Sequence, residues 1–139
     1  MTHSLQAAGA AFAAFAVFVA LDGLWLGLIM RRFYRTQLSP IARMAGGSMA
    51  PIWPAAGVVY LLLSIGVVAF VVPRAEALLW SAVVGGAMFG LVIYGFYNLT
   101  NYATLARWPP AMVVVDTSWG VVICAVASAV ATCTNGWLA

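Results

Sequence analysis

Four long runs of apolar residues dominate the pattern of hydrophobic and polar positions along the chain. They cover about residues 6–30, 55–72, 77–106 and 111–132. Their lengths are close to or above the roughly 20 residues that an α-helix needs to cross the hydrocarbon core of a bilayer. Prolines punctuate the runs: Pro51 and Pro54 precede the second, Pro73 follows it, and Pro109 and Pro110 separate the third from the fourth. The pattern predicts an all-α protein, an integral membrane four-helix bundle with a single transmembrane domain over residues 1–139.

The composition agrees with a membrane protein and excludes several chemistries. Of the 139 residues, 65% are hydrophobic and only 6% are charged, whereas a soluble domain is about 25% charged. Because the sequence has no lysine, it cannot form a Schiff base with a cofactor. The single histidine, His3, leaves no histidine pair to ligate haem or zinc. We therefore expect no cofactor and no metal site.

The six arginines flank the apolar runs, which explains the positive net charge without a nucleic-acid partner. The first loop carries Arg31, Arg32, Arg35 and Arg43, and the third loop carries Arg107. The second loop has only Arg74, beside Glu76. Because cytoplasmic loops carry the excess of arginine, this distribution predicts an N-out/C-out topology. The first run has no Lys or Arg before it, so we expect an uncleaved helix rather than a signal peptide.

Weaker patterns indicate how the segments meet lipid and one another. Residues 33–49 are expected to form a short interfacial helix that places Phe33, Leu38 and Ile41 against lipid. Glycine pairs spaced by four, which are typical of closely packed membrane helices, occur at Gly23/Gly27 and Gly86/Gly90. The second run has little polarity beyond Tyr60 and Ser64, and we expect it to face lipid.

Two aspartates within the apolar runs, Asp22 and Asp116, are the most informative residues. An Asp near the centre of a membrane helix costs about 2.5–3.5 kcal/mol on insertion scales, so it requires a partner or a function. Asp22 lies nine residues before Arg31, while Asn98 and Asp116 lie nine residues before and after Arg107. In the predicted topology these three side chains share one depth, in the cytoplasmic third of the membrane. We therefore expect a shared polar pocket.

The third run carries a polar stripe at helical spacing. Its members recur every three or four residues and are Tyr94, Tyr97, Asn98, Asn101 and Thr104. A second pattern pairs each aspartate with a tryptophan three residues later, giving Asp22/Trp25 and Asp116/Trp119. Residues i and i+3 share a helix face, so each indole is expected to line the same surface as its aspartate. An indole N–H could donate to a carboxylate, either within one helix or across two antiparallel helices.

These polar residues have a purely structural alternative, in which they only hold the helices together through interhelical hydrogen bonds. Ser, Thr or Asn would serve that purpose without the insertion cost of an ionisable group. The use of two aspartates therefore favours a functional site.

Three segments together resemble a known family. They begin at Leu21, Phe89 and Val115 and read Leu-Asp-Gly-Leu-Trp-Leu-Gly, Phe-Gly-Leu-Val-Ile-Tyr-Gly-Phe-Tyr-Asn-Leu-Thr-Asn-Tyr-Ala-Thr-Leu and Val-Asp-Thr-Ser-Trp-Gly. In this order they resemble the bacterial predicted membrane proteins called domain of unknown function 2177. The resemblance implies a membrane protein and supplies no reaction. This chain has Asn98 where the family pattern has Asp.

The favoured hypothesis is a small transporter or channel-like protein of the bacterial inner membrane, and not an enzyme. In it, the two aspartates bind a proton or small cation, and Trp25 and Trp119 line the site. The residues expected to coordinate a small solute are Asn98, Asn101, Tyr94 and Tyr97. Since four helices enclose little space, a homo-oligomer in the lipid bilayer is expected. The alternatives are an enzyme or binding protein that acts on a lipid or amphiphile, and a non-catalytic accessory subunit.

Overall fold

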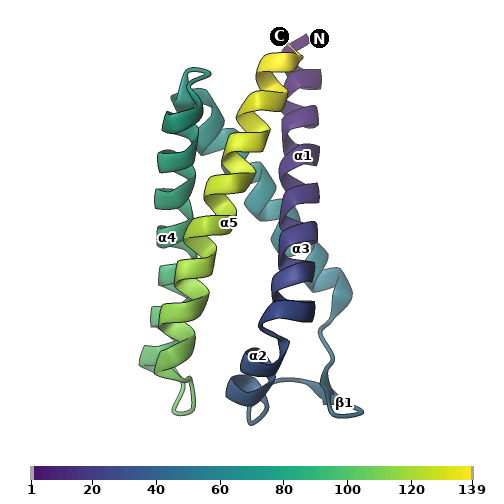
Figure 1. Cartoon of the computed structure of the whole chain (residues 1–139), viewed down its shortest axis with the longest axis vertical. Coiled ribbons are helices and arrows are strands. Elements are labelled where there is room, and N and C mark those ends of the chain that lie inside the picture. Colours follow the sequence, from purple (N-terminus) through teal and green to yellow (C-terminus); the bar gives the residue numbers. More distant parts are fainter. Residues whose placement is uncertain (1, 139) are drawn as a thin grey trace.

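The computed structural model describes residues 2–138, which form a bundle of long helices with short connections (Figure 1). Helix α1 (Thr2–Leu24) continues into a π-helical turn, η1 (Trp25–Ile29), and α3 (Trp53–Gly66) continues through η2 (Val67–Val71) and the 3-10 turn η3 (Val72–Ala75). The other long helices are α4 (Leu79–Thr104) and α5 (Pro110–Trp137). Four segments are long and apolar enough to cross a membrane: His3–Ile29, Trp53–Ala75, Leu79–Thr104 and Pro110–Trp137. The prediction of an all-α membrane protein with four spans is confirmed.

The observed helices differ from the predicted ones mainly at their ends. Pro54 and Pro110 lie inside the first turn of α3 and α5 rather than before them. A proline is tolerated there because the first N–H groups of a helix have no intrahelical acceptor. Pro73 is likewise accommodated, in the 3-10 turn that ends the second span. The prolines therefore mark the helix termini. The second and fourth spans extend beyond the residues expected from hydropathy, whereas the third, Leu79–Thr104, is shorter than the expected 77–106.

The chain runs up and down, so both termini lie at one end of the bundle (Figure 1). At that end the Gln6 Nε2 donates a hydrogen bond of 2.9 Å to the Leu138 carbonyl oxygen, which joins α1 to the end of α5. The opposite end holds residues 31–50 and the connection between α4 and α5 (Figure 1). We call it the arginine end, because these segments contain Arg31, Arg32, Arg35, Arg43 and Arg107. The topology rule used above predicts that the arginine end faces the cytoplasm.

The two glycine pairs have different surroundings. A Cβ atom on Gly90 would collide with the carbonyl oxygen of Gly120, and one on Gly86 would collide with Cys124 and Ser128, so α4 and α5 are in backbone contact here. Gly23 and Gly27 have nothing within 4 Å of such a Cβ atom. The close packing expected of such pairs therefore occurs between α4 and α5, while the pair in the first span, on α1 and η1, packs against none of the described residues.

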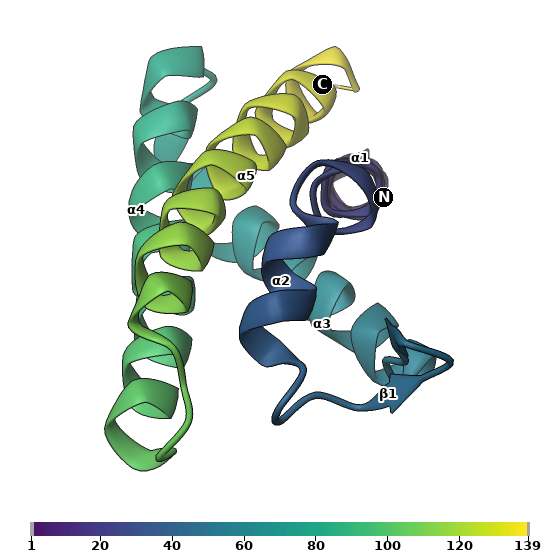
Figure 2. The same cartoon turned by 60° about the horizontal axis from the view of Figure 1, so that its bottom comes forward.

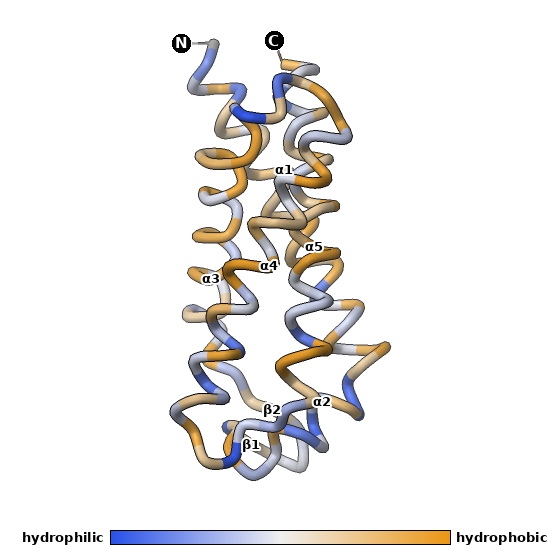
Figure 3. Tube along the Cα trace, turned by 90° about the vertical axis from the view of Figure 1, so that its left-hand side faces the viewer, coloured by the Kyte–Doolittle hydropathy of each residue, from blue (hydrophilic) through white to orange (hydrophobic). Residues whose placement is uncertain are grey.

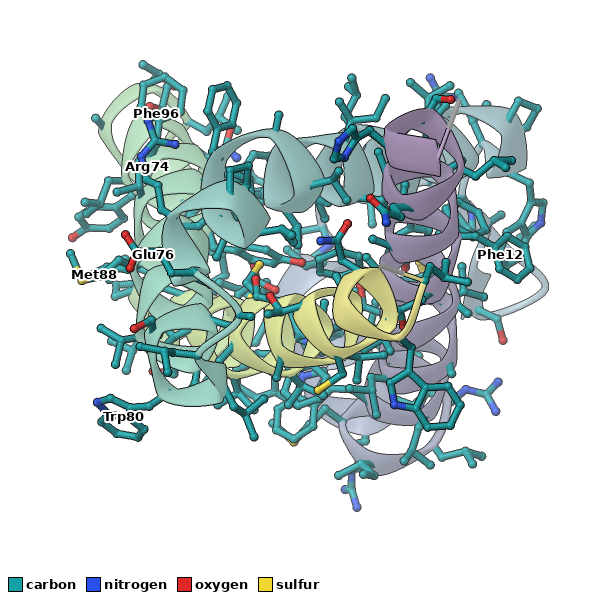
Figure 4. All side chains as sticks on the ribbon, turned by 90° about the horizontal axis from the view of Figure 1, so that it is seen from above. Phe12, Arg74, Glu76, Trp80, Met88 and Phe96 are labelled. Atoms are coloured by element: carbon teal, nitrogen blue, oxygen red, sulfur yellow. The ribbon has the colours of Figure 1, made fainter. Side chains whose placement is uncertain are left out.

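The side chains are arranged as expected for a protein surrounded by lipid. A small apolar core joins α1, η2 and α5 around Phe18, Val67 and Ile123, which are fully buried. Many large apolar side chains point outward, among them Phe12 and Phe96 (Figure 4). Hydrophobic positions cover most of the helix length, and hydrophilic ones gather towards the two ends (Figure 3). The outer surface is thus apolar at the depth where acyl chains would contact it.

The expected interfacial helix over residues 33–49 is only partly correct. Helix α2 (Arg31–Leu38) ends early, and the chain then forms a hairpin of two antiparallel two-residue strands, β1 (Met44–Ala45) and β2 (Ser48–Met49). Gly46 and Gly47, with φ of 56° and 76°, form its turn, which needs the left-handed conformation that glycine adopts readily. Phe33 and Leu38 pack partly on the protein itself, against a cluster of Tyr34, Trp108 and Met112, while Ile41 is exposed.

Candidate functional site

Asp22 from α1 and Asp116 from α5 line the same cavity. The cavity has a volume of about 400 Å³ and is bounded by residues of α1, η1, α3, α4 and α5. Its polar lining consists of the two aspartates and three tyrosines, Tyr60, Tyr94 and Tyr97. The remaining lining is aliphatic, for example Leu26 and Leu63. The structure therefore brings the two carboxylates, which lie 94 positions apart in the sequence (116 − 22), into one apolar cavity.

Asp22 is nearly buried, with 6% of its surface exposed. The Trp119 Nε1 donates a hydrogen bond of 2.6 Å to its Oδ1 atom across the interface between α1 and α5. The side chain of Tyr60, from α3, is a second hydrogen-bonding partner of this carboxylate. Residues of three helices thus meet at Asp22.

Asp116 has one donor for each of its oxygens. The Tyr34 hydroxyl donates to Oδ1 at 2.9 Å, and the Asn98 Nδ2 donates to Oδ2 at 2.7 Å. Asn98 is fully buried, and its Nδ2 also donates to the Tyr94 carbonyl oxygen at 3.0 Å. Its amide oxygen, however, is buried and has no hydrogen-bond donor among the described residues. The Asp116 part of the site therefore retains one unused acceptor.

The two tryptophans stack on each other. The rings of Trp25 and Trp119 are nearly parallel, with an interplanar angle of 3° and centroids 4.3 Å apart. The Trp25 Nε1 donates to the Tyr34 hydroxyl at 3.3 Å, and that hydroxyl in turn donates to Asp116. Trp119 therefore contacts the aspartate of the other helix directly, whereas Trp25 reaches the other aspartate through Tyr34.

Sequence reasoning missed Tyr34. It lies on α2, which crosses the arginine end of the bundle (Figure 2), and only 3% of its surface is exposed. Burial, together with the nearby Asp116 charge, raises the pKa of the Tyr34 hydroxyl above its usual value, so the hydroxyl stays a donor. The sequence feature that could have indicated this role is the position of Tyr34 at the centre of a short amphipathic segment, Arg31–Leu38.

Sequence reasoning also misjudged the second span, which it placed against lipid. Leu63, Ser64 and Val67 on that span are buried, and Tyr60 reaches the carboxylate of Asp22. The Tyr60 ring also contacts the Phe15 ring edge-on, with centroids 6.5 Å apart. The prediction was wrong because a span this apolar has no polar stripe, so hydropathy gives no indication of which of its faces is buried.

The polar stripe on α4 divides into two parts. Tyr94 and Asn98 face the aspartates, as described above. Tyr97 lies at the cavity edge, is 52% exposed, and has its ring edge-on to that of Trp108 with centroids 5.6 Å apart. Asn101 is a hydrogen-bonding partner of Tyr97 and lies outside the cavity lining. Thr104 donates to the Thr100 carbonyl oxygen of its own helix.

The donors described for both carboxylates are neutral: two tyrosine hydroxyls, an asparagine amide and an indole N–H. Within residues 2–138 no arginine forms an ion pair with either aspartate, and no group of three His, Cys, Asp or Glu side chains could hold a metal ion. In a low-dielectric setting, an unpaired carboxylate is costly unless it takes up a proton or a cation. The geometry is therefore suited to binding one or the other.

Comparison with known proteins agrees with this architecture. The family model described as DUF2177, predicted membrane protein, matches residues 8–133. The matched part includes both aspartates and both tryptophans of the site, and it confirms the resemblance noted in the sequence. Searches of curated proteins and of solved structures find no match.

Proposed function

Because the chain belongs to the DUF2177 family of predicted membrane proteins, we propose that it is a small carrier whose intramembrane aspartates bind protons or a cationic solute in exchange. The observation that carries this proposal is that Asp22 and Asp116, from antiparallel helices, line one cavity of about 400 Å³. We place the carrier in the inner membrane of a bacterium, with the arginine end in the cytoplasm.

The balance of charge supports exchange. Neutral donors orient each carboxylate without cancelling its charge, so the site favours uptake of a positive species. A proton and a cationic solute would compete for the same oxygens, because both neutralise the same negative charge. Such competition at one site is the basis of coupled exchange.

The surroundings of the carboxylates support a carrier rather than an open channel. At the arginine end, Tyr34 and the buried Trp108 belong to a cluster that covers Asp116. On the α1–α5 side, the stacked pair of Trp25 and Trp119 fills the space beside Asp22. A species that leaves the cavity towards the arginine end must therefore displace part of this cover, which is the behaviour of a gated site. Since four helices enclose little space, the carrier is proposed to act as a homo-oligomer.

The test is proton flux into liposomes that contain the purified protein and a pH-sensitive dye, measured first under an imposed membrane potential and then under an imposed gradient of Na⁺, K⁺ or choline, so that both uncoupled flux and exchange are detected. The native protein should conduct more than empty liposomes, and Asp22→Asn and Asp116→Asn should each reduce that flux by about ten-fold or more, the effect of removing an essential charged group. Glu76→Gln is the matched control, because it removes the third acidic side chain, which is exposed at the other end of the bundle.

All four proteins must elute as folded, monodisperse particles before their fluxes are compared. Equal flux in the native and aspartate variants, or no flux in any of them, would contradict the carrier. In the second case, a binding protein or enzyme for an amphiphile becomes the better explanation, since it needs the same cavity and no transport. An accessory subunit would show neither flux nor ligand binding.

A further inference from the structure

The cavity opens sideways, between α3 and α4. Helix α3 packs mainly on α1, and α4 packs mainly on α5. The second span meets α4 chiefly through η2 and η3, near the end that carries the termini. Towards the arginine end the two helices diverge (Figure 2). Ala56 and Val59 of α3 and Ile93 and Tyr97 of α4, which line the cavity, lie on the two sides of this divergence.

The rim of this opening is apolar and faces the lipid. Val59, Ile93 and Tyr97 are 53%, 41% and 52% exposed. Tyr97 lies seven residues before Thr104, the last residue of α4, which is about 10 Å along a helix. The opening is thus level with the acyl chains just beneath the headgroups of the leaflet at the arginine end. At that end α2 crosses the bundle (Figure 2), so the direct path into the cavity leads from the bilayer.

The inner wall has the opposite character, because it carries negative charge and aromatic rings. Asp22 and Asp116 line it without a cationic partner, and the rings of Tyr60 and Tyr94 lie beside them. Beside Asp116, the fully buried Asn98 directs its amide at the carboxylate and keeps an oxygen atom without a donor. Carboxylates, aromatic faces and an unused acceptor together favour a ligand with a positive charge that is only weakly hydrated.

Other ligand classes fit less well. An anionic lipid headgroup would be repelled by the two carboxylates. A divalent metal needs more oxygen or nitrogen ligands than this part of the described chain supplies. A small hydrated ion would have to lose its water to pass the largely apolar rim. A cavity of about 400 Å³ is instead within the range of sites for drug-sized molecules, roughly 300–1,000 Å³.

We propose that the cavity binds a monovalent, lipophilic organic cation, which enters laterally from the bilayer between α3 and α4 and places its charge between Asp22 and Asp116. This inference rests on the proposed function, because it assigns the solute class of the same carboxylate site. The apolar body of the ligand contacts Leu26, Leu63 and Ile93, and Val59 forms part of the rim that it passes.

The charge requirement is tested by equilibrium binding to the protein in lipid nanodiscs, with empty nanodiscs as the background. The probe is tetraphenylphosphonium, and tetraphenylborate, which has nearly the same shape and the opposite charge, is the matched control. The native protein should bind the cation saturably and should not bind the anion. Asp22→Asn and Asp116→Asn should each weaken cation binding by about ten-fold or more, as expected for loss of a buried charge partner.

The lateral route is tested on two adjacent valines of α3. Val58 and Val59 are 54% and 53% exposed, but only Val59 lines the cavity. Val59→Trp should therefore weaken binding of tetraphenylphosphonium several-fold by filling the rim, while Val58→Trp, which adds the same bulk towards lipid, should not. Both substitutions are at surface positions, so both variants are expected to fold.

Each result separates this inference from the carrier. Equal binding of the two tetraphenyl ions, or cation binding that ignores both aspartates, would overturn the ligand class. Equal effects of the two valine substitutions would overturn the lateral route. Aspartate-dependent proton flux without cation binding would leave the carrier intact and reject this solute class. Cation binding without proton flux would leave the ligand class intact and contradict the carrier.

Discussion

The indole nitrogen of Trp119 lies 2.6 Å from the Oδ1 atom of Asp22, and this hydrogen bond crosses from α5 to α1. Asp22 has its own tryptophan three residues later, Trp25, which stacks on the ring of Trp119 and donates its N–H to Tyr34. The Asp-x-x-Trp pairs of the two helices therefore contact each other. Trp119 holds the Asp22 carboxylate by a hydrogen bond, and Trp25 holds the Trp119 ring by stacking. Substitutions of Asp22, Trp25 or Trp119 should therefore lower the stability of the fold as well as ligand binding.

Trp119→Phe should destabilise the folded protein by about 1–3 kcal/mol, because it removes a donor from a nearly buried carboxylate and keeps most of the ring stack. The measurement is thermal unfolding in detergent, followed by tryptophan fluorescence. Trp137→Phe serves as the control, since Trp137 is 93% exposed. If Trp119→Phe costs the same in an Asp22→Ala background, which has no side-chain acceptor, as in the native protein, then the two side chains are not coupled and the assigned hydrogen bond is wrong.

Tyr34→Phe should loosen α2 without unfolding the bundle. The ring can still pack against Trp108 and Met112, but Asp116 loses a donor and the Trp25 N–H loses its acceptor. Amide hydrogen exchange in residues 31–38 should accelerate by about ten-fold, which corresponds to the roughly 1.4 kcal/mol expected for such a lost bond. Tyr102→Phe, on an exposed side chain of α4, should leave exchange in α2 unchanged. Unaltered exchange in both variants would show that the hydroxyl does not hold α2 in place.

The raised pKa of Tyr34 predicts the behaviour of the protein at alkaline pH. An unfolded tyrosine ionises near pH 10, and the folded state resists this ionisation. The contribution to stability is therefore complete below about pH 10 and decreases as the pH rises towards the higher folded pKa. The difference in phenolate absorbance between the native protein and Tyr34→Phe should stay near zero at pH 10 and appear only above it. A phenolate signal at pH 10 would mean that the hydroxyl is open to water.

Gly90→Ala and Gly23→Ala should have opposite effects on stability. The methyl group on Gly90 would collide with the backbone of Gly120 and separate α4 from α5, at a cost of about 1–3 kcal/mol. The methyl group on Gly23 would meet nothing within 4 Å, and alanine is the better helix former by up to about 1 kcal/mol. Unfolding temperatures of the two variants, measured side by side, should lie on either side of the native value. A decrease for Gly23→Ala as large as that for Gly90→Ala would reveal an interface on α1 that a single chain does not contain.

What the sequence determined by itself is the set of membrane spans and the depth of the aspartates. Whether a segment of about 20 apolar residues enters a bilayer depends on its own length and composition, so four spans could be read from hydropathy. Counting from Arg31 and Arg107 placed Asp22, Asn98 and Asp116 at one level, because rise along a helix is regular. The three-residue spacing likewise placed each tryptophan on the same face as its aspartate.

Only the tertiary structure decided which faces meet. Periodicity describes a face within its own helix, whereas in a membrane the pairing of faces follows from many weak packing contacts summed over all helices. For this reason Gly86 and Gly90 pack closely while the similar pair in the first span does not, and Tyr60 turns inward from a span that carries no polar stripe. Tyr34 reaches Asp116 because α2 crosses the arginine end of the bundle. Contacts between segments far apart in the chain set this position of α2.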